Sequence, residues 1–158
     1  MTKLLLILHV LAAIVAVGPV TVAGSMFPAA ARRAAGTPDQ HETLATVRVL
    51  HRVCRVYAAL GLAVPVLGFA TASGLHILGS PWLIMSIALT GAAALVLALL
   101  VLPAQERLLA QLAGSAAGTA AVERAQTARL AMLTGAFNLL WAAVTVLMIL
   151  RPGSTTGV

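Results

Sequence analysis

Histidine is the residue type in this sequence that is best suited to bind a metal or carry a proton, and two of the four histidines accompany apolar runs. His9 lies within the first apolar run, and His76 follows the second. Neutral imidazole binds haem iron and soft metal ions, so His9 and His76 are the candidate ligands of a cofactor, with haem b the candidate. The alternative is structural. One hydrogen bond to a facing carbonyl or serine would satisfy His9, and His76 would simply lie at an interface between lipid and water.

A second cluster combines one histidine with three arginines at helical spacing: Arg48, His51, Arg52 and Arg55. Such a cluster could bind an anionic ligand, such as a lipid phosphate or a haem propionate. The alternative is a basic ladder that faces lipid headgroups and the acids Glu106 and Glu123. Most of a membrane span separates His51 from His9. We therefore expect the cluster around His51 and the candidate ligand His9 to lie on opposite sides of the membrane.

The residue constellations of common enzymes are missing. The sequence has no HExxH motif, no P-loop, no CxxC pair and no Ser/His/Asp arrangement. No acidic residue lies within an apolar run, which disfavours a proton or cation pump. Cys54 is the only cysteine and is expected to be a small packed residue. We therefore expect no catalytic residue and no dedicated metal site, which favours a non-enzymatic protein over an enzyme.

The composition places most of the chain in a membrane. Apolar residues make up 61% of the 158 positions, charged residues make up 9%, and the mean hydropathy is +1.03. Soluble domains carry about 25% charged residues, so this chain cannot cover a globule with polar side chains. The net charge of +6 does not indicate nucleic acid, because the basic residues flank apolar runs as topology signals do.

Four apolar runs, at residues 4–27, 56–75, 82–102 and 130–150, approach the length of about 20 residues that crosses a bilayer. Lys3 and the small residues near Gly24 also fit a signal peptide, but the run continues through Phe27, so we expect it to remain as the first span. The sequence predicts an all-α protein with a single membrane domain, residues 1–158, folded as an up-down-up-down bundle of four transmembrane helices.

The basic residues also predict the orientation. Eight of the ten Lys and Arg lie between the first and second runs or between the third and fourth, whereas Lys3 and Arg151 lie on the other side. The positive-inside rule then puts both termini outside. The richness in Arg, Ala and Gly is typical of a GC-rich bacterial genome, so the expected location is a bacterial cytoplasmic membrane.

Helical spacing continues beyond the runs, which predicts helices of about 30 residues or more that extend into the cytoplasm. Pro19 and Pro65 lie mid-span and should kink their helices. Trp82 is expected to be an anchor at the outer interface. One face of the fourth run carries polar and aromatic residues, from which we expect Asn138 to hydrogen-bond to another helix: Thr134, Asn138, Trp141 and Thr145.

Several short motifs carry a family resemblance: Leu8-His9-Val10-Leu11, the pair Arg32-Arg33, Pro103-Ala-Gln-Glu-Arg107 and the segment from Leu147 to Gly153. With these motifs the chain resembles uncharacterised bacterial four-helix integral membrane proteins. More distantly it resembles the membrane domain of copper-resistance protein D and the membrane-bound protoporphyrinogen oxidase family. The distant resemblance implies copper transfer or haem binding, and His9 occupies the place of the first-helix histidine implicated in haem binding.

These observations leave two hypotheses for the function. The first is a non-enzymatic membrane protein, an accessory or structural subunit of a larger bacterial membrane complex, whose partners are the lipid bilayer and other membrane subunits or further copies of itself. The motivation is the lack of catalytic residues together with small, apolar faces suited to lateral docking. The alternative is a haem- or metal-binding membrane redox protein that uses His9.

Overall fold

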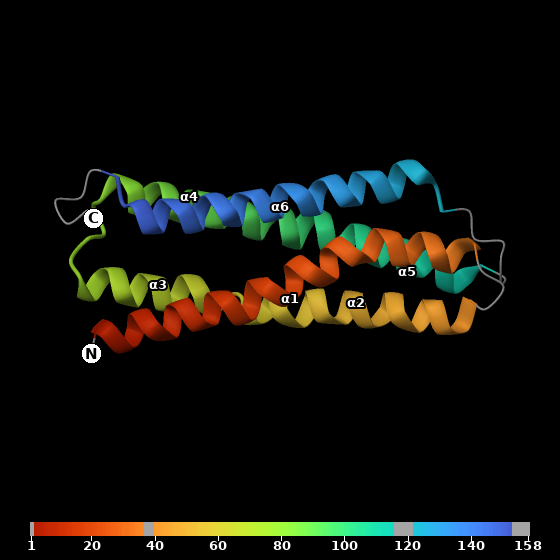
Figure 1. Cartoon of the computed structure of the whole chain (residues 1–158), viewed down its shortest axis with the longest axis horizontal. Coiled ribbons are helices and arrows are strands. Elements are labelled where there is room, and N and C mark those ends of the chain that lie inside the picture. Colours follow the sequence, from red (N-terminus) through yellow and green to blue (C-terminus); the bar gives the residue numbers. More distant parts are fainter. Residues whose placement is uncertain (1, 37–39, 116–121, 153–158) are drawn as a thin grey trace.

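The computed structural model describes residues 2–36, 40–115 and 122–152, and within these ranges the chain is helical with no strand. Figure 1 shows the helices lying along one long axis. Their bounds are α1 (Thr2–Gly36), α2 (Gln40–Leu60), α3 (Ala63–Gly74), α4 (Pro81–Leu95), the π-helix η1 (Val96–Val101), α5 (Leu102–Gly114) and α6 (Arg124–Leu150). The expected all-α, four-helix architecture is confirmed.

The seven elements form four rods, because α2 continues into α3, and α4 continues through η1 into α5 (Figure 1). Each rod is long and apolar enough to cross a membrane: 34 residues for each of the first three and 27 for the fourth. At 1.5 Å per residue the three longer rods measure about 51 Å, whereas the hydrocarbon core of a bilayer measures about 30 Å. The three longer rods therefore exceed the thickness of the hydrocarbon core, as the predicted helix lengths require.

Two of the rods are interrupted one to two turns ahead of a proline. Pro65 lacks the N–H that would bond to the carbonyl of Gly61, and that carbonyl instead accepts from the N–H of Val64 at 3.1 Å, which separates α2 from α3. In the third rod η1 ends just before Pro103, and the N–H of Leu102 bonds back to the carbonyl of Leu97. The helix is thus interrupted ahead of Pro65, where the sequence predicts a kink. α1 remains helical through Pro19, and the kink expected there stays a prediction.

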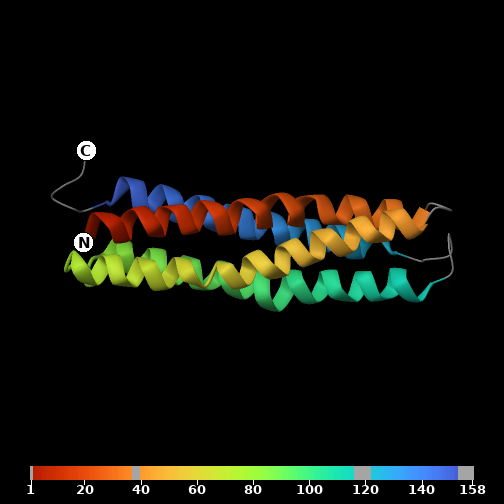
Figure 2. The ribbon, with the colours of Figure 1, turned by 90° about the horizontal axis from the view of Figure 1, so that it is seen from below.

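The bundle has two unlike ends. We call the end with Thr2, the connection from α3 to α4 and Arg151 the termini end, and the opposite end, where α1 and α5 finish and α2 and α6 begin, the loop end (Figures 1 and 2). The main buried core lies toward the loop end and includes Phe27, Val47, Leu112 and Leu130. Only a small cluster around Trp82 packs at the termini end.

Helix pairing explains this difference. At the termini end α3 packs on α1 and α4 packs on α6, but α3 makes at most marginal contact with α4 or α6. Figure 1 shows the two pairs diverging toward the termini end. The bundle is therefore tightly packed at the loop end and divided into two pairs of helices at the termini end.

Candidate functional site

A large cavity fills the space between the two helix pairs at the termini end. Its volume is about 1100 Å³, and its walls are mostly apolar side chains from α1, α3, α4 and α6. Ligand pockets in proteins typically measure about 300–1000 Å³ and combine apolar walls with a few polar groups. The polar side chains here include His9, Asn138 and Arg151. The cavity is thus of a size and composition that suits a mainly apolar ligand.

His9 reaches the cavity from α1 and is fixed by α3. Its Nδ1 lies 2.9 Å from the carbonyl oxygen of Val64. Because a carbonyl oxygen only accepts, Nδ1 must carry the proton, and the lone pair of the neutral ring then belongs to Nε2. This matches the arrangement in metalloproteins, in which a ligating histidine donates its other N–H to a backbone carbonyl.

Gly68 makes room for the ring of His9. A Cβ atom at position 68 would lie 2.9 Å from Cε1 and 3.2 Å from Nδ1 of His9, closer than side chains approach one another. Any larger residue here would push the imidazole away from the carbonyl of Val64. The sequence predicted a facing carbonyl as one structural partner of His9, but it did not identify Val64 or Gly68.

His76 is placed differently. It is exposed and lies in the connection after α3, with a left-handed φ of 58°. Its neighbours Leu75 and Ile77 line the cavity, whereas His76 does not. The cavity therefore does not bring the two candidate ligands together, and a site shared by His9 and His76 stays a prediction.

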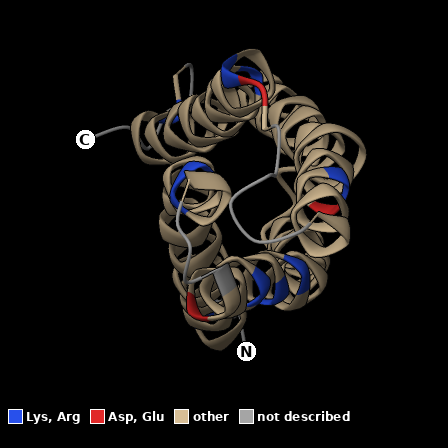
Figure 3. Cartoon of the chain, turned by 90° about the vertical axis from the view of Figure 1, so that its right-hand side faces the viewer, with Lys and Arg blue, Asp and Glu red and all other residues tan. Residues whose placement is uncertain are grey.

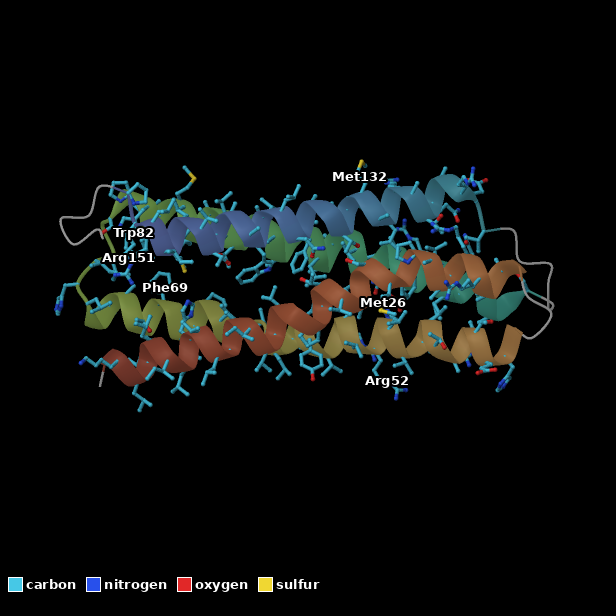
Figure 4. All side chains as sticks on the ribbon, in the orientation of Figure 1. Met26, Arg52, Phe69, Trp82, Met132 and Arg151 are labelled. Atoms are coloured by element: carbon cyan, nitrogen blue, oxygen red, sulfur yellow. The ribbon has the colours of Figure 1, made fainter. Side chains whose placement is uncertain are left out.

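Arg151 and Trp82 stand together at the rim of the cavity (Figure 4). The guanidinium carbon lies 5.6 Å from the centre of the Trp82 ring, and Nε donates to the carbonyl of Met148 at 3.3 Å. Trp82 is 8% exposed, so it packs inside the bundle instead of projecting outward as an interfacial anchor. That expectation was wrong, because the end of α6 returns to this level and covers the indole ring.

The polar face of α6 leads from the cavity toward the core. Asn138 lines the cavity and donates from Nδ2 to Oγ of Ser25 at 3.4 Å, which confirms the predicted bond to another helix. Thr134 lies one turn further in, and its methyl group would lie 3.1 Å from a Cβ atom at Gly24. Oγ1 of Thr134 and Oδ1 of Asn138 are buried and find no hydrogen-bond partner among the described residues.

The basic cluster on α2 is divided by the structure. Arg48, Arg52 and Arg55 are exposed, and Figure 4 shows Arg52 pointing away from the bundle. His51 instead lies inside, where Nδ1 is 3.1 Å from Oε1 of Gln105. The amide Nε2 of Gln105 in turn contacts Sγ of Cys54 at 3.5 Å. A site for an anionic lipid therefore stays a prediction. The three exposed arginines could form it, but the ring of His51 could not take part.

Charged residues gather at the loop end. Figure 3 looks onto that end and shows basic and acidic residues near the ends of the helices. Among the described residues, no group of three or more His, Cys, Asp and Glu could hold a metal ion. The histidine at the cavity is thus the described side chain best suited to bind a metal-containing ligand.

The helical rods, the apolar surface and the buried polar contacts together define an integral membrane protein with four candidate spans. The chain belongs to a family of predicted integral membrane proteins (DUF2269), whose family model matches residues 3–152. Comparison with curated proteins and with solved structures gave no significant match. The family supports the membrane class of the chain and leaves its ligand to be inferred from the site.

Proposed function

We propose that the protein is a non-enzymatic integral membrane protein that binds haem b in the cavity, where Nε2 of His9 would hold the iron. The observation that carries this proposal is the hydrogen bond from Nδ1 of His9 to Val64, which leaves the lone pair on Nε2. The sequence alone favours an accessory subunit over haem binding. The cavity beside His9 reverses that preference.

The cavity suits haem b in three respects. Its volume of about 1100 Å³ is slightly above the usual range of ligand pockets, which leaves room for a large ligand. Its apolar walls match the face of a porphyrin, and Arg151 at the rim matches an acidic substituent. Bound haem would supply one-electron redox chemistry, while this chain would hold the ring, ligate the iron and exclude water.

An absorption spectrum of the purified protein, recorded with and without dithionite, tests the proposal. Haem added during expression or titrated into the protein in mild detergent should give a Soret band that shifts on reduction. His9→Ala should abolish the band, whereas His41→Ala, a change at an exposed residue of the loop end, should preserve it. If the wild-type protein takes up no haem, the proposal fails.

The same spectra examine the predicted role of His76. If His76 supplies a second axial ligand, His76→Ala converts a low-spin spectrum into a high-spin one. If the spectrum is unchanged, His76 is not a ligand. Met148 is the other residue of the cavity wall with a side chain that ligates iron in known haem proteins.

A second candidate function is the accessory subunit of a larger membrane complex. The observation that favours it is that α3 makes at most marginal contact with α4, which leaves the cavity only partly enclosed. A transmembrane helix of a partner, or of a second copy, could occupy this opening and pack on exposed residues such as Phe69. Co-purification of a stoichiometric partner in mild detergent, and its loss on Phe69→Ala, would support this role over haem binding.

For the location we propose a bacterial cytoplasmic membrane with both termini outside. The halves of the four rods that lie toward the loop end carry eight of the ten basic residues, and such residues are retained in the cytoplasm. The cavity would then lie in the outer half of the bilayer. Arg48, Arg52 and Arg55 would face anionic headgroups of the inner leaflet.

A further inference from the structure

Among the described residues that line the cavity, Arg151 is the one charged side chain. It follows the last residue of α6 in a left-handed conformation, with a φ of 41°. Its Nε donates to the carbonyl of Met148, and the guanidinium carbon lies over the ring of Trp82. These contacts hold the side chain at the rim, and no described residue accepts from the N–H groups of its two Nη atoms.

The described part of the chain offers no carboxylate to that guanidinium. Its acidic residues are Glu42, Glu106 and Glu123, which belong to the loop-end half of the helices. Glu123 and Arg151 flank the two ends of α6, whose 27 residues measure about 40 Å. The charge of Arg151 is therefore not neutralised by a described carboxylate, although it borders a mostly apolar cavity.

A cation at the rim of an apolar cavity favours a ligand that combines an anionic group with an apolar body. Arg binds carboxylate and phosphate oxygens through two parallel N–H bonds, and such bonds strengthen where water is scarce. The apolar walls favour a hydrocarbon or ring body, and the rim favours an acid at one end of that body. We propose that the cavity selects an amphipathic acid, whose carboxylate or phosphate group binds Arg151 while its apolar body lies between α3 and α6.

This inference deepens the proposed function, because haem carries propionates and is one such acid. The part that concerns haem rests on the proposed function. The preference for acids should also hold for ligands that contain no iron, and the binding of such ligands does not depend on His9. The two parts can therefore be separated by pairs of ligands that share a body and differ only in the acid.

The experiment measures binding in nanodiscs of a zwitterionic lipid. The first pair of probes is haemin and its dimethyl ester, and the second is cis-parinaric acid and its methyl ester, which is followed by fluorescence. For the wild-type protein we expect each acid to bind at least about tenfold more tightly than its ester, equivalent to about 1.4 kcal/mol. Arg151→Gln should remove that preference and leave the affinity for the esters unchanged, and Arg151→Lys should retain part of it.

Arg129→Gln is the matched control, because Arg129 is an exposed arginine of α6 near the loop end. This variant should keep the full preference for acids. Size-exclusion profiles would verify that each variant is folded.

Each outcome decides the inference. If the wild-type protein binds acid and ester equally in both pairs, Arg151 serves lipid headgroups and the inference is overturned. If neither pair binds, the inference and the proposed function both fail. If parinaric acid shows the preference and haemin does not bind, the inference stands and the haem proposal fails. If haemin and its ester bind equally while His9→Ala abolishes both, and parinaric acid shows no preference, the haem proposal stands and the inference fails.

Discussion

The ring of His9 lies against Gly68 and donates from Nδ1 to the carbonyl oxygen of Val64, 2.9 Å away, which joins α1 to α3. In an α-helix the Cα–Cβ bond tilts toward the N-terminus, so a side chain at position 68 would lie over the turn that contains residue 64. Gly68 leaves that turn open. The position of the imidazole thus depends on a residue that contributes no side chain.

Gly68→Ala should therefore disturb His9 more than its small size suggests. The added Cβ would lie 2.9 Å from Cε1, which is too close, so the ring or the helix backbone must shift. We expect this shift to lengthen the bond from His9 to Val64. Loss of such a supporting bond weakens metal binding by about 10–100-fold. We expect a decrease of that size in haem affinity, measured by titration of the Soret band.

Gly91→Ala is the control for this change. Gly91 also lines the cavity, but a Cβ atom there would meet nothing within 4 Å. The control should bind haem as the wild-type protein does. If the two variants bind haem with equal affinity, the contact between His9 and Gly68 does not determine haem binding.

The architecture could be predicted from the sequence because lipid imposes a simple rule. Long apolar runs must form helices that satisfy their own backbone, and their number and order follow directly from the runs. The division of the second rod could also be expected, since Pro65 cannot bond to Gly61. The π-helix before Pro103 was missed, although a proline inside a continuous helix is the signal that could have indicated it.

The site could be predicted only in part. His9 is conspicuous as an ionisable residue within an apolar run, whereas its partners depend on how α1 is rotated against α3. The roles of Arg151 and Trp82 depend on a contact between the start of α4 and the end of α6, which no local pattern specifies. Hydropathy assigns residues to a depth in the membrane but does not determine which side of a helix faces its neighbours.

Thr134→Val should leave the protein as stable as before or more stable. Oγ1 of Thr134 is buried without a partner, and an unpaired buried hydroxyl costs about 1–3 kcal/mol. Valine has nearly the same shape and removes the hydroxyl. We expect the free energy of unfolding, from SDS titration in mixed micelles, to rise by about 1 kcal/mol or to stay constant.

Thr127→Val provides the contrast on the same helix. Thr127 is also buried, but its Oγ1 donates to the carbonyl of Arg124 at 3.0 Å and accepts from Arg32 at 3.4 Å. This variant should lose about 1 kcal/mol. A comparable loss in Thr134→Val would instead reveal an ordered water that pairs with the hydroxyl.

Gln105→Leu should destabilise the loop-end core. Gln105 is fully buried, and its amide contacts both His51 and Cys54. Leucine would fill the space but leave Nδ1 of His51 unpaired, at an expected cost of about 1–3 kcal/mol. The melting temperature in detergent measures the effect, and Gln111→Leu, at an exposed position of the same helix, should show none. The hypothesis that this contact stabilises the core fails if the two variants melt alike.

The proposed orientation predicts which helix ends are accessible from outside the cell. Ser73 is exposed near the end of α3 at the termini end, and Ala113 is exposed near the end of α5 at the loop end. In a background in which the buried Cys54 is replaced by alanine, Ser73→Cys should react with a membrane-impermeant maleimide on intact cells. Ala113→Cys should react only after the cells are broken, because eight of the ten basic residues hold its end of the bundle in the cytoplasm. The reverse pattern would place the cavity in the inner leaflet, where Arg151 would meet cytoplasmic ligands.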